Sequence, residues 1–512
     1  MTMSLSYTLA TYSSKRKFFD FFVPDNGIAA LASAIKDRGG DCAYFDLNAF
    51  HTSEEDFLSF VEQNRPNIVG FKLFQSGFLH TNELAKQVRK VSPTSLVIAG
   101  GPHSTLYGEA IFQVTDAYDV IIVGEGERAI VEIGEYVTGE RAQDEVRNSI
   151  WKINNEVVAT ERVWENDLDS LPLPDYDVFR LNEYFPIFLL NMVRGCPNQC
   201  AFCCHPYVWG RKCSNAELRG RSRSAIKRTN VVRRRSFDSI RSEIELYRMK
   251  YGVRSFSIVD STPDLPLIRK ICNLICTSRP DIKWVGFGKI DLFDDQTYEM
   301  LGRANCKCLW YGIESGNEEM IVRIGKRYSR QDIFEAIARA HRNGIRTIGG
   351  FIVGFPGETE RSLAETGDLA CNLGLDAVVI SPYLLQPGSP IALSPEKHGI
   401  RLDADWMVRS MCVPENEEPH EVDFYEIDGL RNVQWWERFR AVSDYPGWDF
   451  DRQIEAYELA TLIGEQLGLE PDEFMKEVDV ILKKQDADSL HALIGKAWLQ
   501  EKANSVCCGL SR

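Results

Sequence analysis

The chain has 512 residues and a mass of 58.2 kDa, which exceeds the roughly 250–300 residues at which a single hydrophobic core stops growing. Its residues are 44% hydrophobic, 11% aromatic and 26% charged, which excludes a globally disordered chain. Acidic residues outnumber basic ones by 74 to 59, and the net charge of −15 disfavours binding of nucleic acid or anionic membranes through the whole surface.

The sequence contains no apolar run of the ~18–20 residues that a membrane-spanning helix needs. Its most apolar stretch, Phe185 to Val193, is interrupted by Pro186 and Asn191. The N-terminus lacks the shape of a signal peptide, because its basic residues follow the weakly apolar start. We therefore expect a cytoplasmic protein whose 14 cysteines are thiols, catalytic groups or metal ligands, and not disulfides.

The first 165 residues alternate short apolar runs with amphipathic stretches, as βαβ units do. Helices are predicted at Ile28–Asp37 and Thr81–Val91, and strands at Ala43–Leu47, Ile68–Leu73, Ser95–Ala99 and Val120–Val123. Glycines stand where these elements end, as tight turns require. We expect an α/β domain over residues 1–165 with a doubly wound, Rossmann-like sheet, whose ligand lies beyond the carboxyl ends of the strands.

An acidic linker with two prolines, Asp167 to Asp175, separates this domain from a region with a longer βα period. Strands are predicted there at Asn191–Arg194, Ser255–Val259, Trp284–Gly288, Leu309–Gly312, Thr347–Val353 and Ala377–Ser381. Six strands predict a partial (β/α)6 barrel over residues 166–390, with chemistry at the carboxyl ends of the strands. Residues 391–512 predict a mainly helical C-terminal domain, because Gln453–Leu467 and Asp472–Lys484 have helical apolar spacing.

A cysteine motif follows the first predicted barrel strand. Cys196, Cys200 and Cys203 have the spacing C-x-x-x-C-x-x-C. Three thiolates at this spacing can hold one 4Fe–4S cube and leave its fourth iron open to a substrate or cofactor. The alternative is a zinc site, for which Cys204 or His205 would supply the fourth ligand. Five other cysteines lack the grouped spacing of a second cluster: Cys213, Cys306, Cys308, Cys507 and Cys508.

Over residues 191–390 the chain resembles the radical S-adenosylmethionine (SAM) superfamily. In that family three cysteines hold a 4Fe–4S cluster, SAM binds the open iron, and its reductive cleavage yields a 5′-deoxyadenosyl radical. The resemblance also rests on Phe256–Asp260, Tyr311–Gly316, Gly350–Glu358 and Pro387–Pro390, which follow in the expected order. It implies that the three cysteines are the catalytic cluster ligands. It further implies SAM contacts from Phe202, Asp260, Glu314, Ser315 and Gly354.

The N-terminal region resembles the cobalamin-binding domain that precedes the barrel in a large subclass of this superfamily. The matching segments are Val97–His103, Tyr118–Glu127 and the linker Leu171–Asp177. The resemblance implies that cobalamin contacts Gly100, Gly101, Gly124, Glu125 and Gly126, with Ser76 bonded to its nucleotide tail. No D-x-H-x-x-G motif is present, so no histidine ligand to cobalt is indicated. His51 and His103 are therefore interpreted as surface or turn residues.

The segment from Arg211 to Arg235 carries ten Lys or Arg and one acid, Glu217, within an acidic protein. Blocks of like charge usually form solvated, mobile segments, and this is the interpretation that we favour. The alternative is a local anion site for a phosphorylated, nucleotidylated or carboxylate-rich substrate. The segment lacks the interleaved aromatics of a nucleic-acid groove, so RNA binding is only weakly indicated.

The subclass resemblance implies methylation of an unactivated carbon, or less often phosphorus, in a biosynthetic intermediate. The adenosyl radical would remove hydrogen, methylcobalamin would supply the methyl group, and a second SAM would restore it. One alternative is a radical cyclisation, rearrangement or oxidation in the same subclass. A more distant one is a zinc-binding or cobalamin-binding protein without turnover. The implied partners are a small-molecule substrate and an electron donor such as flavodoxin or ferredoxin.

Overall fold

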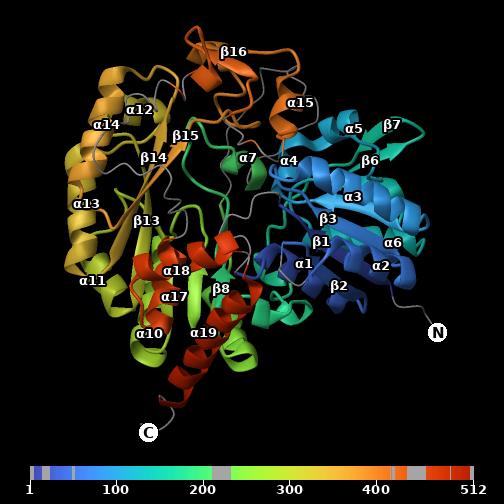
Figure 1. Cartoon of the computed structure of the whole chain (residues 1–512), viewed down its shortest axis with the longest axis horizontal. Helices are drawn as coiled ribbons and strands as arrows, with labels where there is room; N and C mark the ends of the chain where they lie inside the picture. Colours follow the sequence, from blue (N-terminus) through green and yellow to red (C-terminus); the bar gives the residue numbers. More distant parts are fainter. Residues whose placement is uncertain are drawn as a thin grey trace.

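Two parallel sheets with helices on their faces make up most of the protein (Figure 1). The computed structural model describes residues 5–13, 23–48, 52–209, 232–414, 421–434, 457–484 and 486–507, together with positions 417 and 437. One sheet belongs to the N-terminal region and the other to the middle of the chain. The predicted fold class, a Rossmann-like sheet followed by a parallel barrel sheet, is confirmed.

The N-terminal sheet has the strand order β2-β1-β3-β4-β5-β6-β7. Its parallel strands are β1 (Ser6–Thr11), β2 (Asp41–Asp46), β3 (Ile68–Lys72), β4 (Leu96–Gly100) and β5 (Val120–Ile122). An antiparallel hairpin of β6 (Ser149–Ile153) and β7 (Glu156–Ala159) extends one edge. α1 (Asn26–Asp37) and α6 (Glu127–Val137) cover one face, and α2 (Glu54–Asn64) and α3 (Phe78–Val91) cover the other, so the sheet is doubly wound. β1 and the hairpin were not predicted.

The barrel sheet has six parallel strands in the order β15-β14-β13-β12-β11-β8. They are β8 (Ile187–Leu190), β11 (Ser255–Ile258), β12 (Lys283–Gly288), β13 (Cys306–Glu314), β14 (Arg346–Val353) and β15 (Ala377–Pro382). The helices between them are α9 (Phe237–Leu246), α10 (Leu265–Ser278), α11 (Asp295–Arg303), α12 (Glu318–Ile324), α13 (Arg330–Arg342) and α14 (Glu360–Asn372). A separate two-stranded ribbon consists of β9 (Val193–Arg194) and β10 (Arg233–Arg234).

The first barrel strand is β8, and the prediction of a strand at Asn191–Arg194 in this sheet is wrong. The chain leaves the sheet after β8 because the Asp260 side chain holds the next backbone groups. Its Oδ1 accepts hydrogen bonds from the N–H groups of Met192, at 2.8 Å, and Val193, at 3.0 Å. The chain then continues into the ribbon strand β9, which leads directly to the cysteine motif.

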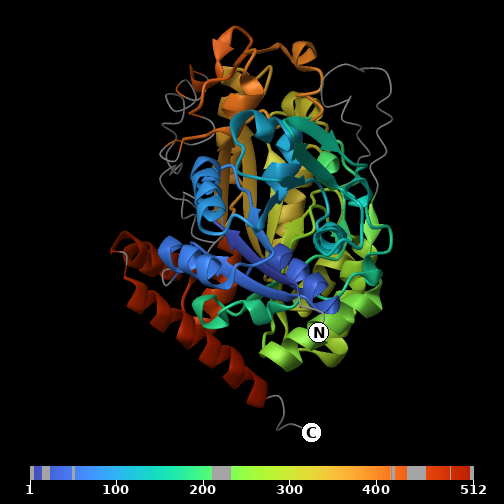
Figure 2. The same ribbon diagram turned by 90° about the vertical axis from the view of Figure 1, so that its right-hand side faces the viewer.

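The C-terminal region divides between opposite ends of the molecule, as Figures 1 and 2 show. At one end, β16 (Ile400–Leu402), β17 (Tyr425–Ile427) and β18 (Leu430–Arg431) form a small antiparallel sheet that the sequence did not predict. It packs on the segments that follow β14 and β15, next to α15 (Trp406–Met411). At the other end lie α17 (Tyr457–Leu467), α18 (Pro471–Lys484) and α19 (Ala487–Cys507).

Helix α17 packs against the concave face of the barrel sheet. Its Leu462 and Ile463 share a core with Ile187, Val285 and Cys308, which point inward from three strands. The helix therefore fills the barrel near the amino ends of the strands. The concave face toward their carboxyl ends is the part left for a substrate.

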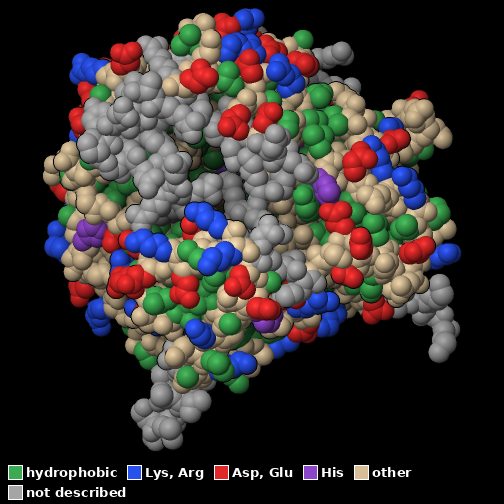
Figure 3. Space-filling view, viewed as in Figure 1, with side chains coloured by type: hydrophobic (Ala, Val, Ile, Leu, Met, Phe, Trp, Pro, Cys, Tyr) green, Lys and Arg blue, Asp and Glu red, His purple; other side chains and the backbone are tan. Residues whose placement is uncertain are grey.

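None of the helices in the described part of the chain is both long enough and apolar enough to cross a bilayer. Figure 3 shows acidic and basic side chains interspersed over the described part of one face. Charged side chains of the described residues form many ion pairs, such as Arg269 with Asp294 at 3.1 Å.

Candidate functional site

The three motif cysteines lie in the loop between β9 and α7 (His205–Trp209), beside the carboxyl ends of the barrel strands. Gly195 begins the loop with a φ of 95°, a conformation that favours glycine. Burial, with smaller contributions from the neighbouring Cys204, Cys200 and Cys196, raises the pKa of the Cys203 thiol to about 12. The three sulfurs are thus within electrostatic reach of one another. Such thiols become thiolates only with a bound cation, which suits them as metal ligands.

Asp260 fixes the entrance to this loop. Besides the backbone of Met192 and Val193, its Oδ1 faces the amide of Asn191 at 3.4 Å. Its other oxygen, Oδ2, is buried and has no hydrogen-bond partner among the described residues. Burial raises the pKa of Asp260 to about 7, against the lowering effect of the two backbone bonds. The structure therefore gives Asp260 a positioning role, and its predicted contact with SAM stays a prediction.

The two residues that follow Asp260 also bind the cysteine motif and the start of α7. The hydroxyl of Ser261 lies 2.8 Å from Nε2 of His205. The hydroxyl of Thr262 lies 3.1 Å from the sulfur of Cys196 and accepts a hydrogen bond from the Asn198 amide at 2.9 Å. One short segment thus contacts the motif at its first cysteine and the chain just after its last one.

A buried ion pair at the end of β13 lies beside Cys200. Glu314 has a φ of 68°, which is rare for a residue other than glycine, and the register with β14 shifts at this point. The turn brings its Oε1 within 2.7 Å of Nζ of Lys326. Burial alone would lower the pKa of Lys326, but the charge of Glu314 outweighs it and raises that pKa. Lys326 therefore stays cationic, and its charge partly offsets the effect of burial on the Cys200 thiol.

The other predicted SAM contacts have different surroundings. Ser315 is buried, and its hydroxyl lies 3.1 Å from that of Thr366 on α14. Gly354 has a φ of 78°, and a Cβ there would meet no atom within 4 Å, so its backbone borders open space. Its N–H donates to Glu358, whose pKa burial raises to about 7. Phe202 packs, partly buried, on the core under the small antiparallel sheet.

The zinc alternative for the cysteine loop stays a prediction. In the described residues, no three His, Cys, Asp or Glu side chains surround one point as a single metal ion requires. A cube binds each cysteine through a different iron, so its ligands stand further apart than those of zinc. For the second cluster, Cys306 and Cys308 are buried in β13, and the side chains at 213, 507 and 508 lie outside the described residues.

A cavity of about 340 Å³ lies at the carboxyl ends of the N-terminal strands. Its wall also includes the linker and barrel residues, and it brings together Gly100, Gly101, Gly124, Glu125 and Gly126. Gly101 has a φ of 98°, and a Cβ there would come within 3.0 Å of Cγ of Lys72. The absence of a side chain at Gly101 therefore lets the backbone pass close to Lys72. Ser76 is not part of this wall, and its hydroxyl lies 2.7 Å from that of Ser13.

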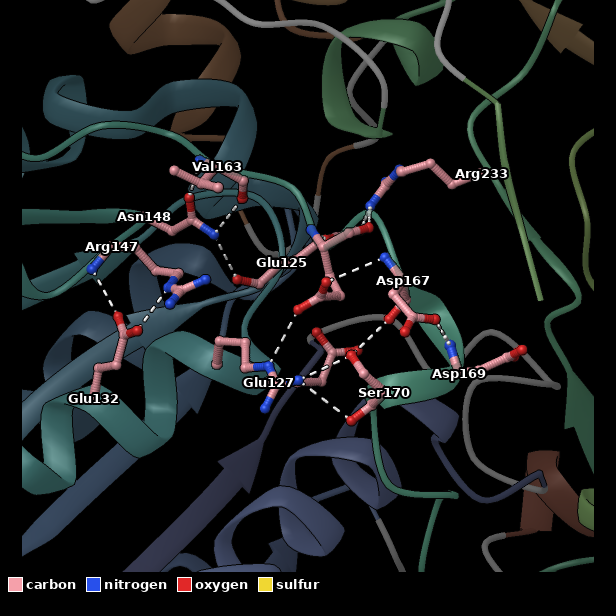
Figure 4. Close-up of polar contacts among 12 residues, drawn as sticks. Glu125, Glu127, Glu132, Arg147, Asn148, Val163, Asp167, Asp169, Ser170 and Arg233 are labelled. Carbon is pink, nitrogen blue, oxygen red and sulfur yellow. Dashed lines mark hydrogen bonds and ion pairs between the residues drawn. The ribbon is translucent and has the colours of Figure 1, made fainter. Parts of the chain in front are cut away.

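Buried charges join the cavity wall to the cysteine loop. Oε1 of Glu125 lies 2.6 Å from Nη1 of Arg233 and 3.2 Å from Nη1 of Arg194 (Figure 4 shows Glu125 facing Arg233). Arg194 also pairs with Glu127. Burial alone would raise the pKa of Glu127, but Arg194 keeps it lowered, so the four charges balance. Arg194 and Arg233 are directly paired across the ribbon, and Arg194 stands two residues before Cys196.

Ion pairs hold the described end of the basic segment, residues 232–235, against acidic side chains. Residues 210–231 lie outside the described residues, so the interpretation of a mobile loop stays untested there. The last three arginines each pair with an acid: Arg233 with Glu125, Arg234 with Asp264, and Arg235 with Glu243. The run of positive charge in the sequence gives no indication of these separate acidic partners, so this role was not predicted.

The interpretation of His103 as a surface or turn residue is wrong. Its side chain is buried in α4 (Pro102–Tyr107), with ring centroids 4.8 Å from Phe78 and 4.6 Å from Tyr107. Burial lowers its pKa to about 3, so the imidazole is neutral. His51 lies outside the described residues.

Two family descriptions match the chain. The B12 binding domain matches residues 19–134, which include the glycines of the cavity wall. The radical SAM superfamily matches residues 190–370, which include the cysteine loop. The chain therefore contains a B12 binding domain followed by a radical SAM domain. This order is that of the predicted subclass, and the two domains imply the predicted cofactors: a 4Fe–4S cluster, SAM and cobalamin.

Individual relatives of this radical SAM protein include methyltransferases and a cyclase. An uncharacterized methyltransferase of Pyrococcus horikoshii is 24% identical over 393 residues, which are 75% of this chain and 81% of the relative. An anaerobic magnesium-protoporphyrin IX monomethyl ester cyclase of Cereibacter sphaeroides is 24% identical over 385 residues, which are 72% of this chain and 60% of the relative.

Among solved structures, the radical SAM methyltransferase TsrM of Kitasatospora setae, with cobalamin and a 4Fe–4S cluster bound, has a TM-score of 0.69 at 16% identity. The match covers 95% of this chain and all of that one. At this identity the likeness shows a shared fold.

The described residues fit these radical SAM cofactors. The cysteine loop offers three partly or fully buried thiols, and the backbone at Gly354 borders open space beside it. The cavity at the end of the first sheet has a volume of about 340 Å³, and its wall contains Gly100, Gly101, Gly124 and Gly126. Sequence analysis did not find Arg194, Thr262 or Lys326, because none of them stands out by spacing.

Proposed function

We propose that this protein is a cobalamin-dependent radical SAM methyltransferase that acts on an unactivated carbon, or a phosphorus, of a small biosynthetic intermediate. The observation that carries the proposal is the buried charged network between the cavity wall and the cysteine loop. Methyl transfer by this chemistry needs both cofactor sites to face one substrate. When bound, the cluster with SAM supplies a carbon-centred radical, and cobalamin supplies the methyl group. Likeness to two methyltransferases supports this choice.

The chain's own residues have separate tasks in this proposal. Cys196, Cys200 and Cys203 hold the cluster, while Asp260 and Thr262 fix the loop that carries them. The strand-end residues predicted from the family motifs orient SAM. The glycine wall holds cobalamin, and α17 closes the amino end of the barrel, so that water is excluded from that side. An external one-electron donor of the flavodoxin or ferredoxin class reduces the cluster.

Anaerobic reconstitution with iron and sulfide tests the ligand assignment. We expect about four irons per chain in the wild type and loss of the cluster in Cys200→Ala. Cys276→Ala is the matched control, because Cys276 is exposed on α10 and contacts none of the motif cysteines. A Cys200→Ala protein that keeps the full iron content and cleaves SAM normally would contradict the assignment.

A second candidate is a radical cyclisation, rearrangement or oxidation, which the likeness to the cyclase of Cereibacter sphaeroides supports. Incubation of the reconstituted protein with methyl-labelled SAM and a small-molecule cell extract separates the two. Label in a new small molecule supports methyl transfer. Deoxyadenosine formation with product that carries no label supports the second candidate.

A further inference from the structure

Cys196 differs from the other two motif cysteines in its hydrogen-bond partners. Its sulfur lies 3.1 Å from the hydroxyl oxygen of Thr262 and 3.5 Å from the amide nitrogen of Asn198. The same amide nitrogen lies 2.9 Å from the Thr262 hydroxyl, so the three groups form a closed triangle. For Cys203 the described contact is a backbone N–H, from His205 at 3.4 Å.

The chemistry of these groups fixes the direction of each bond. An amide –NH2 only donates, so one of its hydrogens bonds the Thr262 oxygen and the other points to the sulfur. A cluster-bound cysteine is a thiolate without a proton, so it only accepts. The single hydroxyl proton of Thr262 therefore points to Cys196. The reverse orientation of the Asn198 amide would place its carbonyl oxygen against a thiolate, which is repulsive.

We propose that Thr262, oriented by Asn198, raises the reduction potential of the cluster by donating a hydrogen bond to the sulfur of Cys196. The inference rests on the ligand set of the proposed function. Reduction adds one electron from a low-potential donor to the oxidised cube, and no bond forms or breaks. The added negative charge spreads onto the sulfurs, so a donor at the sulfur stabilises the reduced state more than the oxidised one.

Thr262→Val tests the inference, because it keeps the shape of the side chain and removes the hydroxyl. The wild type and the variant are reconstituted with iron and sulfide and titrated with dithionite at fixed potentials, and the reduced cluster is counted by electron paramagnetic resonance. We expect about a threefold to tenfold lower ratio of reduced to oxidised cluster in the variant, where tenfold equals 59 mV for one electron. Thr262→Ser, which restores the hydroxyl, should return the potential toward the wild-type value.

Two further variants make the result specific. Thr347→Val is the control, because Thr347 is a buried threonine at the start of β14 that bonds His341 and Asp376 instead of a cysteine. Its potential should equal that of the wild type. Asn198→Ala should shift the potential in the same direction as Thr262→Val, and it decides the question if Thr262→Val fails to hold four irons.

An unchanged potential in a cluster-loaded Thr262→Val protein would overturn this inference and leave the proposed ligand set standing. A shift of the potential in Thr347→Val equal to that in Thr262→Val would also overturn this inference and leave the proposed ligand set standing. A wild-type protein that binds no cluster would overturn both the proposed function and this inference.

Discussion

Buried carboxyl groups hold the turns at the ends of the barrel strands. Asp260 binds backbone N–H groups, Glu314 pairs with Lys326, and Glu358 accepts from Gly354. The sequence predicts the first two as cofactor contacts from their place in the motifs. A strand-end carboxylate has the same place in the sequence whether it faces a cofactor or a neighbouring loop, so the motif alone does not separate the two roles.

The positioning role of Asp260 predicts a dependence on pH. Burial raises its pKa from 3.8 to about 7, so between these values the folded protein holds a proton that the unfolded chain has lost. The stability that this proton contributes is complete at low pH and disappears as the pH rises through about 7. Asp260→Asn removes the titration, so its thermal midpoint should rise relative to the wild type between about pH 4 and pH 7. A constant difference between the two midpoints would contradict the raised pKa.

Asp260→Ala completes this test, because it removes the acceptor of two backbone hydrogen bonds. We expect it to lower the thermal midpoint at every pH, with a cost of about 1–3 kcal/mol. An alanine variant as stable as the asparagine variant would show that the backbone bonds contribute nothing.

Among the helices and strands, the length of a strand largely decides whether the sequence predicts it. The long strands β12 to β15 carry apolar runs between turn signals, and the sequence predicts them to within a few residues. The ribbon strands β9 and β10 have two residues each, and β16 to β18 have two or three, so they carry no periodicity. β1, with the sequence Ser-Tyr-Thr-Leu-Ala-Thr, is a buried interior strand of its sheet although half of its residues are Ser or Thr.

The arginines of the ribbon join the cavity wall to the cysteine loop. We therefore predict that a change in the ribbon affects both the binding of cobalamin and the binding of the cluster. In Arg194→Met, the buried carboxylates of Glu125 and Glu127 keep one of the two arginines of this network, Arg233. We expect about a tenfold weaker affinity for hydroxocobalamin, measured by equilibrium dialysis, and a lower iron content after reconstitution.

Arg147→Met is the control for this variant. Arg147 pairs with the buried Glu132 at 2.6 Å in the same domain, but neither residue belongs to the cavity wall (Figure 4). This variant should lose stability and keep its affinity for hydroxocobalamin. Equal losses of affinity in Arg147→Met and Arg194→Met would mean that the ribbon has no special part in the coupling.

At the scale of the whole molecule, the cavity belongs to both sheets. Its wall combines strand ends of the first sheet, the proline-containing linker, and the barrel residues Asn191, Arg194 and Val259. Length and motif order predict which domain comes first. The contact between the domain surfaces depends on residues that are far apart in the chain. A single sequence gives no information about which of these residues lie side by side.

A cavity with walls from both domains predicts how cobalamin changes the stability of the whole protein. Hydroxocobalamin at about 100 times its Kd should stabilise the folded state by about 2.7 kcal/mol, seen as a rise in the thermal midpoint. Gly124→Val should lose this rise, because Gly124 lies in the wall with a φ of 86° and its Cβ would approach Nε of Arg162 to 3.0 Å. Gly139→Val is matched in backbone strain, since Gly139 has a φ of 79° but open space around its Cβ, and should keep the rise.

Because Arg194 and Val259 belong to the barrel, unfolding of either domain opens the cavity. The ligand should therefore raise the transitions of both domains, and a rise confined to one of them would mean that the cavity depends on that domain alone.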